Sequence, residues 1–289
     1  MQTRVAGPYD MARQNEYFGG WTQAAGGGVV MAFPVEGWTH SAAVVLRQSA
    51  PDTVDGEVHG DPADAGAQAW RQALAVLSLD VDGTGYPQVG ERDPILGELQ
   101  REHAYVRPVL FHSPYEAACA FVIGHRMRIE QGRAIRQRIA RAHGEAFAVD
   151  GVTVHAFPAP ERLRRCTELP GVDDEKLVRL HGIADAALDG RLDRARLRAM
   201  PVADALADVR RLRGIGEFFA AGIVMRGAGL VDALPGDEMT RAGIQRRYRM
   251  PAPPPDAEVE RLAGAWRPYR MWCSVLLHAA ERRARATAS

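Results

Sequence analysis

The stretch ADVRRLRGIGEFFAAGIVMRGAGLVDALPGDEMTR, residues 207–241, decides how the rest of the chain is interpreted. A helical pattern ends near Leu212, and a second helix is expected directly after Gly216. Gly214 and Gly216 allow positive φ angles and a close backbone approach. Free N–H groups and a positive dipole end at the start of the second helix favour a phosphate. The spacing therefore predicts either a phosphate-binding hairpin or a tight connection between two helices.

The end of this stretch carries a carboxylate just after a turn. Leu234-Pro235-Gly236 is the turn, and Asp237 follows it at the expected N-terminus of another helix. Aspartate is a common helix N-cap. The residues of this turn by themselves therefore favour a helix cap at Asp237.

Composition narrows the class of protein. The chain has 289 residues, 46% hydrophobic and 25% charged, which is the balance of a globular protein with its own core. It contains no run of 18 apolar residues and no apolar N-terminal stretch, so no membrane span or signal peptide is expected. The three cysteines, Cys119, Cys166 and Cys273, are too few for a four-cysteine metal or iron–sulfur site and suit a reducing cytoplasm.

The formal net charge is zero, but the charges are unevenly distributed. Residues 1–100 contain 5 Arg and 13 Asp or Glu, although the whole chain has 36 residues of each sign. The remainder is therefore basic, which indicates either a polyanionic partner or a solvated basic surface.

The predicted elements divide the chain into a small α+β domain, residues 1–88, and a helical domain, residues 89–289. Val-rich runs broken by Gly and Pro predict strands, and a change to helical spacing follows a turn-rich segment. In the first domain we expect strands within 29–38 and 40–48, a helix within 64–79 and a linker over 81–94.

The second domain is predicted to be helical throughout. Ser113, Pro114 and Glu116 have the spacing of an N-cap, a first-turn proline and a capping box, and the helix they open is apolar on nearly all sides. Further helices are predicted within 95–103, 131–144, 156–166, 173–190, 201–212, 217–229 and, as a pair, 255–286.

The central stretch resembles the helix–hairpin–helix superfamily of DNA glycosylases, and within it 3-methyladenine-DNA glycosylase II. The matching residues are Leu212-x-Gly214-Ile215-Gly216, Ala220-Ala221, Arg226-Gly227, Asp232 and Leu234-Pro235-Gly236-Asp237, with further similarity at 111–127, 157–163 and 266–270. The resemblance covers residues 105–282 well and 1–90 loosely. It implies a mainly α fold: a helical core of two subdomains with an N-terminal antiparallel sheet plus helices, a hairpin unit at 202–227 and a Gly/Pro-Asp loop at 228–241.

The resemblance implies monofunctional hydrolysis of the N-glycosidic bond of alkylated purines in duplex DNA, as in base excision repair. Asp237 matches the catalytic aspartate, with Glu238 as a second carboxylate beside it. Bifunctional relatives have a lysine where this chain has Phe218, so no AP-lyase activity is implied. A non-catalytic helix–hairpin–helix DNA-binding protein is the alternative from another class.

The resemblance also assigns DNA contacts. Backbone amides of the hairpin would hold a phosphate, and Arg126 would be the wedge that replaces the everted base, unless it and His125 are simply polar residues at a helix end. The DNA-binding residues implied are Gly214, Gly216, Phe218, His125, Arg126 and Arg241, with Arg246 and Arg247 as further phosphate contacts.

Relatives surround a cationic base with aromatic walls, which cation–π attraction favours. Here Phe218 forms one wall, whereas Gly222 and His278 stand where the subfamily has bulkier aromatic residues. Tyr269 and Trp272 belong either to the pocket or to the core. The thinner pocket leaves open a glycosylase for another lesion, such as a bulky, cross-linked or deaminated base.

By resemblance alone, the backbone carbonyls of Arg210, Leu212 and Ile215 would bind a monovalent cation, Na or K. No other cofactor is expected. The expected partner is damaged double-stranded DNA, and the protein is expected to be a cytoplasmic, nucleoid-associated monomer that does not bind membranes.

Overall fold

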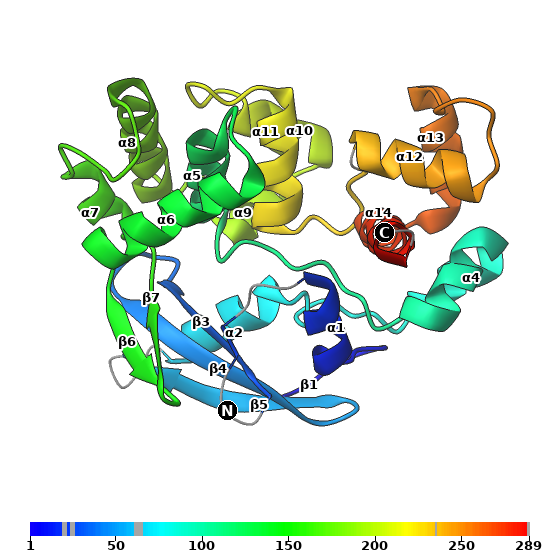
Figure 1. The fold of residues 1–289 in the computed structure, drawn as a ribbon, viewed down its shortest axis with the longest axis horizontal. Helices are drawn as coiled ribbons and strands as arrows, with labels where there is room; N and C mark the ends of the chain where they lie inside the picture. Colours follow the sequence, from blue (N-terminus) through cyan, green and yellow to red (C-terminus); the bar gives the residue numbers. More distant parts are fainter. Residues whose placement is uncertain (19–21, 24–26, 61–65, 235, 288–289) are drawn as a thin grey trace.

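A computed structural model shows a twisted antiparallel sheet below a body of helices (Figure 1). It describes residues 1–18, 22–23, 27–60, 66–234 and 236–287, so Pro235 of the predicted turn lies outside the described residues. The mainly α fold with a small N-terminal antiparallel sheet is confirmed. No helix in the described ranges is long and apolar enough to cross a membrane.

The sheet is buried on both faces where its sequence is a continuous apolar run. Its strands have the order β1-β5-β4-β3-β2, all antiparallel. Alternate side chains of β3, among them Met31 and Phe33, pack in one cluster with buried residues of the segment 69–79. Val30 and Ala32 point to the other face of the sheet, where a separate β-hairpin covers them. The strands are β1 (Gln2–Arg4), β2 (Thr22–Gln23), β3 (Val29–Pro34), β4 (Ser41–Ala50) and β5 (Thr53–His59).

That hairpin, β6 (Ala146–Val149) and β7 (Val152–His155), is an element that the sequence analysis missed. Its turn consists of Asp150 and Gly151, with φ angles of 49° and 76°. Asp-Gly with two positive φ angles is the favoured two-residue hairpin turn, so this dipeptide was the available signal. The hairpin comes from the helical half of the chain but covers the N-terminal sheet.

The helices follow the predicted pattern with three additions. α3 forms inside the segment expected to be a linker, because Pro87 opens a turn whose Val89 is fully buried. The other two additions are α1 and α9. The helices are α1 (Met11–Phe18), α2 (Gly66–Val76), α3 (Pro87–Arg92), α4 (Pro94–His103), α5 (Pro114–Gly124), α6 (Ile129–His143), α7 (Pro160–Arg164), α8 (Asp174–Leu188), α9 (Arg194–Ala199), α10 (Val202–Val209), α11 (Glu217–Gly222), the π-helical η1 (Ile223–Ala228), α12 (Glu238–Arg247), α13 (Asp256–Ala263), the 3-10 turn η2 (Gly264–Trp266) and α14 (Arg270–Thr287).

The central helix α5 begins as its sequence indicates and is buried along most of its length. Ser113 Oγ accepts a hydrogen bond from the Glu116 N–H at 3.1 Å, which confirms the N-cap. The Glu116 carboxylate does not complete the capping box. It contacts His112 Nδ1 at 2.9 Å instead.

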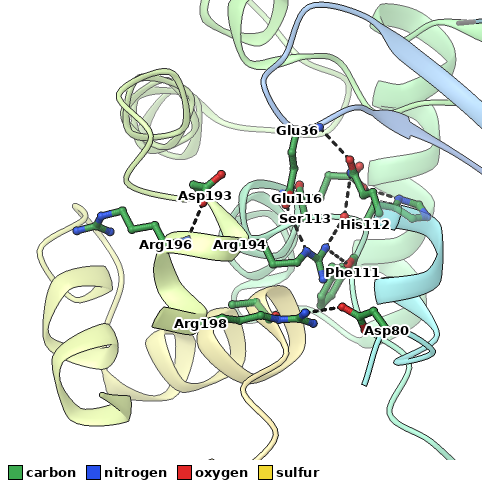
Figure 2. A network of polar contacts seen from close by, with 12 residues as sticks. Glu36, Asp80, Phe111, His112, Ser113, Glu116, Asp193, Arg194, Arg196 and Arg198 are labelled. Atoms are coloured by element: carbon green, nitrogen blue, oxygen red, sulfur yellow. Dashed lines mark hydrogen bonds and ion pairs between the residues drawn. The ribbon is translucent and has the colours of Figure 1, made fainter. Parts of the chain in front are cut away.

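A polar network joins the sheet region to the helical body (Figure 2). Arg194 of α9 is 5% exposed; its Nε lies 3.4 Å from a carboxylate oxygen of Glu36, just after β3, and its Nη2 donates to the His112 carbonyl at 2.6 Å. Arg198, one turn further along α9, pairs with Asp80. These contacts connect residues that are far apart in sequence. They therefore hold the sheet region against α9 and the helical body.

Candidate active site

The turn between α10 and α11 is the predicted hairpin, and its backbone is open to a ligand. Gly214 has a φ of +83°, which favours glycine. A Cβ atom added to Gly216 would meet nothing within 4 Å, so the space beside this α-carbon is free. Gly216 is the N-cap of α11, whose first-turn N–H groups have no intrahelical acceptor. A negatively charged group can therefore approach the backbone here.

The chain leaves the hairpin through η1 and is anchored before it reaches the aspartate. Gly229, with a φ of +78°, ends η1 and donates to the Val224 carbonyl at 3.1 Å. Two residues after Leu230, the Asp232 carboxylate accepts a hydrogen bond from Arg270 Nε of α14 at 2.8 Å. Asp232, which is part of the quoted motif, thus holds the loop that leads to Asp237.

Asp237 is the N-cap of α12 and also remains accessible. Its Oδ1 accepts the Thr240 N–H at 2.7 Å, and its Oδ2 accepts the Thr240 hydroxyl at 3.0 Å. The side chain is 26% exposed. The capping interpretation is confirmed, and the exposure leaves the carboxylate available to a bound molecule.

A histidine from α14 completes the surroundings of this carboxylate. His278 Nε2 lies 3.1 Å from Asp237 Oδ1 and 3.0 Å from Thr240 Oγ1, which in turn lies 2.6 Å from Ser274 Oγ. Burial raises the pKa of Asp237, but the hydrogen bond and charge of His278 and the Thr240 hydrogen bonds outweigh it, so the pKa is lowered. The group is a carboxylate at neutral pH.

Aromatic side chains gather beside the hairpin. Phe218 is 68% exposed, and its ring centroid lies 6.3 Å from that of Phe121, in an edge-on arrangement. Phe219 packs against Phe121 at 5.4 Å and against His125 at 5.5 Å. The sequence analysis missed Phe121 and Phe219. Phe121 and His125 are four residues apart at the end of α5 and its C-cap, so both rings are expected on the same side of the helix. This spacing was the sequence signal for an aromatic group here.

The remaining pocket candidates lie in two places. Gly222 lies under the ring of Phe121, so it belongs to the aromatic group near the hairpin. Tyr269 and Trp272 are 7% and 1% exposed and pack against Tyr86 at centroid distances of 5.5 and 5.2 Å. Of the two interpretations left open for them, this burial fits the core.

The basic candidates also differ in their surroundings. Arg126 is exposed, with a φ of +59°, in the turn after α5, and two exposed apolar residues, Met127 and Ile129, accompany it. Arg241 is engaged within the protein: its Nη1 donates to the Pro254 carbonyl at 2.8 Å and it pairs with an aspartate of α13. Arg246 and Arg247 pair with Glu281.

The three candidate cation ligands lie in the hairpin turn. Arg210 is the C-cap of α10, and the Leu212 carbonyl accepts the Ile215 N–H at 3.1 Å. Carbonyl oxygens are the donors that hard monovalent and alkaline-earth cations prefer, so the donor set fits such an ion. In the described part of the chain, no group of three or more His, Cys, Asp or Glu side chains forms a metal site.

Comparisons with known proteins identify relatives by sequence and by fold. No protein-family model matches the chain. It is 25% identical over 206 residues to a DNA-3-methyladenine glycosylase of Bacillus subtilis, covering 70% of this chain and 68% of that protein.

Solved structures show the same fold. A 3-methyladenine DNA glycosylase from Archaeoglobus fulgidus matches with a TM-score of 0.78 and 16% identity over 98% of both chains. An 8-oxoguanine glycosylase/lyase from Clostridium acetobutylicum, in complex with double-stranded DNA, matches with a TM-score of 0.71 and 15% identity over 99% of this chain and 98% of that one. The chain therefore has the fold of the helix–hairpin–helix DNA glycosylases, together with the hairpin and the loop aspartate that its sequence predicted.

Proposed function

We propose that this protein is a DNA glycosylase that hydrolyses the N-glycosidic bond of alkylated purines, of the 3-methyladenine and 7-methylguanine type, in double-stranded DNA. The observation that carries the proposal is Asp237, an accessible carboxylate kept ionised at the N-terminus of α12, one short loop after the hairpin unit. The named Bacillus subtilis relative supports the choice of substrate.

The reaction follows from the charge of this site. As the bond between C1′ of the deoxyribose and the base nitrogen breaks, its electron pair leaves with the base, and positive charge develops on the sugar. The Asp237 carboxylate stabilises that charge. Water then adds its oxygen to C1′ and loses a proton, which leaves an abasic site. An alkylated purine already carries positive charge, so it departs without a strong acid.

The position of the chain's lysine supports hydrolysis without strand cleavage. Phe218 stands where bifunctional relatives have a lysine, and Lys176 is the only lysine in the sequence. Lys176 Nζ donates to the Ile123 carbonyl at 3.0 Å and the His125 carbonyl at 3.5 Å, so it is tied to the end of α5. A Schiff base with the sugar needs a free amine nucleophile. Borohydride is therefore expected to trap no covalent adduct with DNA.

DNA binding is assigned to the hairpin amides, Phe218 and the turn carrying Arg126. The free space beside Gly216 admits a phosphate, and exposed Phe218 offers a stacking face. The carbonyls of Arg210, Leu212 and Ile215 would hold a Na or K ion, which supplies positive charge near that phosphate. We propose a monomer acting on nucleoid DNA in the cytoplasm.

Base release from methylated duplex DNA tests the proposal. Asp237→Asn keeps the cap, since asparagine caps helices as well as aspartate does, but removes the charge. Asp173→Asn is the matched control, because Asp173 caps α8 through the Lys176 N–H at 2.8 Å in the same way. We expect Asp237→Asn to lose base release by at least about 100-fold while it still binds DNA. Unchanged release by Asp237→Asn contradicts the proposal.

A second candidate is excision of a different lesion. Gly222 and His278 replace bulkier aromatic residues, and one structural neighbour is an 8-oxoguanine glycosylase/lyase. A panel of duplexes with methylated, oxidised, deaminated and bulky bases distinguishes the two. Release from another lesion but not from methylated purines would favour the second candidate. Binding to every duplex without release would identify a DNA-binding protein that lacks catalysis.

A further inference from the structure

We propose that His278 is a positioning residue for Asp237: its Nε2–H fixes the carboxylate in the orientation that faces the sugar of an everted nucleotide. This inference rests on the proposed function for its consequence in catalysis. The hydrogen-bond arrangement on which it stands involves only residues of α12 and α14, and it can be measured without any substrate.

The hydrogen-bond partners fix where the proton on His278 lies. The Thr240 hydroxyl has one proton, which it donates to Asp237 Oδ2 at 3.0 Å. Ser274 must then be the donor in its 2.6 Å contact with Thr240 Oγ1. His278 Nε2 faces two acceptors, Asp237 Oδ1 at 3.1 Å and Thr240 Oγ1 at 3.0 Å, so it must carry a hydrogen. The tautomer of His278 follows from this chain of donors.

Burial makes the arrangement rigid. Thr240 and Ser274 are both fully buried, so water does not compete for their hydroxyl groups. The side chains of Asp237 and His278 remain 26% and 21% exposed, which leaves the outer side of the pair open. Oδ1 accepts two hydrogen bonds and Oδ2 accepts one. Three donors on one carboxylate favour its ionised form and restrict its rotation.

Every variant at position 278 retains the other charged residues near Asp237. Glu238 is the next residue on α12, Arg226 of η1 interacts electrostatically with both Asp237 and Arg282, and Arg282 lies one turn beyond His278 on α14. Nearby charged groups already engaged in ion pairs are Arg241 with Asp256, and Arg246 and Arg247 with Glu281. A comparison of variants at position 278 therefore measures the effect of His278 alone on the Asp237 carboxylate.

The test measures the titration of the Asp237 carboxyl carbon by NMR in the full chain, with Asp237→Asn to assign the signal. His278→Phe fills the same space without a donor, and His278→Leu serves if the phenylalanine variant does not fold. His278→Gln keeps an N–H donor but replaces the imidazole ring. We expect the apolar variants to titrate about one pH unit higher than wild type, because one charged hydrogen bond is lost, and the glutamine variant to lie between them.

The same variants test the effect on catalysis. The acid limb of the pH profile for base release should move upward with the carboxyl titration, and His278→Gln should recover part of kcat with little change in KM. An unchanged titration in the apolar variants, or the same titration in the glutamine and apolar variants, overturns the inference. If wild type releases no base from any lesion, the proposed function fails, and the NMR titration still decides the position of the proton.

Discussion

Gly222 of α11 and Phe121 of α5 are in direct contact: a Cβ atom on Gly222 would lie 2.1 Å from Cζ of the phenylalanine. The ring of Phe121 therefore fills the space that a larger residue at position 222 would occupy. It also reaches Phe218 and Phe219, so an aromatic surface forms beside the hairpin from residues of two helices. An aromatic ring from α5 therefore occupies the space beside Gly222.

Gly222→Ala is expected to destabilise the protein by about 1–3 kcal/mol, because the new methyl group forces the Phe121 ring out of its place. Gly182→Ala is the control, since Gly182 lies in the exposed face of α8 with nothing within 4 Å of an added Cβ. There the helix propensity of alanine should stabilise by about 0.5–1 kcal/mol. Urea unfolding of both variants measures the difference, and equal effects would contradict the packing argument.

Phe218→Ala should weaken DNA binding by about 1–3 kcal/mol and leave the free energy of unfolding nearly unchanged. The side chain is 68% exposed, so its packing contributes little to stability, whereas its ring offers a stacking face for a base. Val178→Ala, at an apolar residue 50% exposed on α8, is the control for loss of exposed apolar surface. Fluorescence anisotropy with a labelled duplex tests both; equal affinities of the two variants would show that Phe218 does not contact DNA.

Glu36→Gln is expected to cost about 3–5 kcal/mol of stability, because it leaves the Arg194 guanidinium buried without its counter-charge. The two side chains are 14% and 6% exposed and connect the sheet region to α9 (Figure 2). Asp52→Asn removes an ion pair with Arg4 in which the side chains are 55% and 87% exposed, and it should change stability by less than about 0.5 kcal/mol. Thermal unfolding compares them. A small effect at Glu36 would mean that the carbonyl acceptors of Arg194 suffice.

The cost of Asp237→Asn should depend on pH. Because the folded pKa of Asp237 is lowered, its carboxylate stabilises the folded state above the unfolded pKa, and this contribution is lost as pH falls through the folded pKa. The variant should therefore be less stable than wild type at neutral pH, by about 1 kcal/mol, and equally stable in acid. Denaturant unfolding across this range measures it; a constant difference would show that ionisation is not involved.

Thiol labelling should distinguish the three cysteines. Cys119 and Cys273 are fully buried, and burial raises the pKa of each thiol well above its usual value. Cys166 is partly exposed and unpaired with another cysteine. A thiol reagent should therefore modify Cys166 in the native protein and all three after denaturation. Cys166→Ser should abolish native labelling, and residual labelling would reveal opening of the core.

The local elements could be predicted because their signals lie within a few residues of one another. Ser113 with Pro114, and Gly214 with Gly216, are capping and turn patterns whose chemistry is short-range. The Asp150-Gly151 turn had such a signal too and was overlooked. Glu116 shows the limit, since its pairing with His112 competes with the local capping box and wins.

The sequence by itself determined the fold class, the hairpin and the aspartate after it, because helix periodicity, glycine turns and the Asp237 cap depend on neighbouring residues. Only the tertiary structure decided which side chains surround that aspartate and which face the hairpin. His278 and Phe121 reach their partners across 41 and 101 residues of sequence, from Asp237 and from Gly222. Contacts of that separation arise from how whole helices pack, and no local pattern in the chain encodes them.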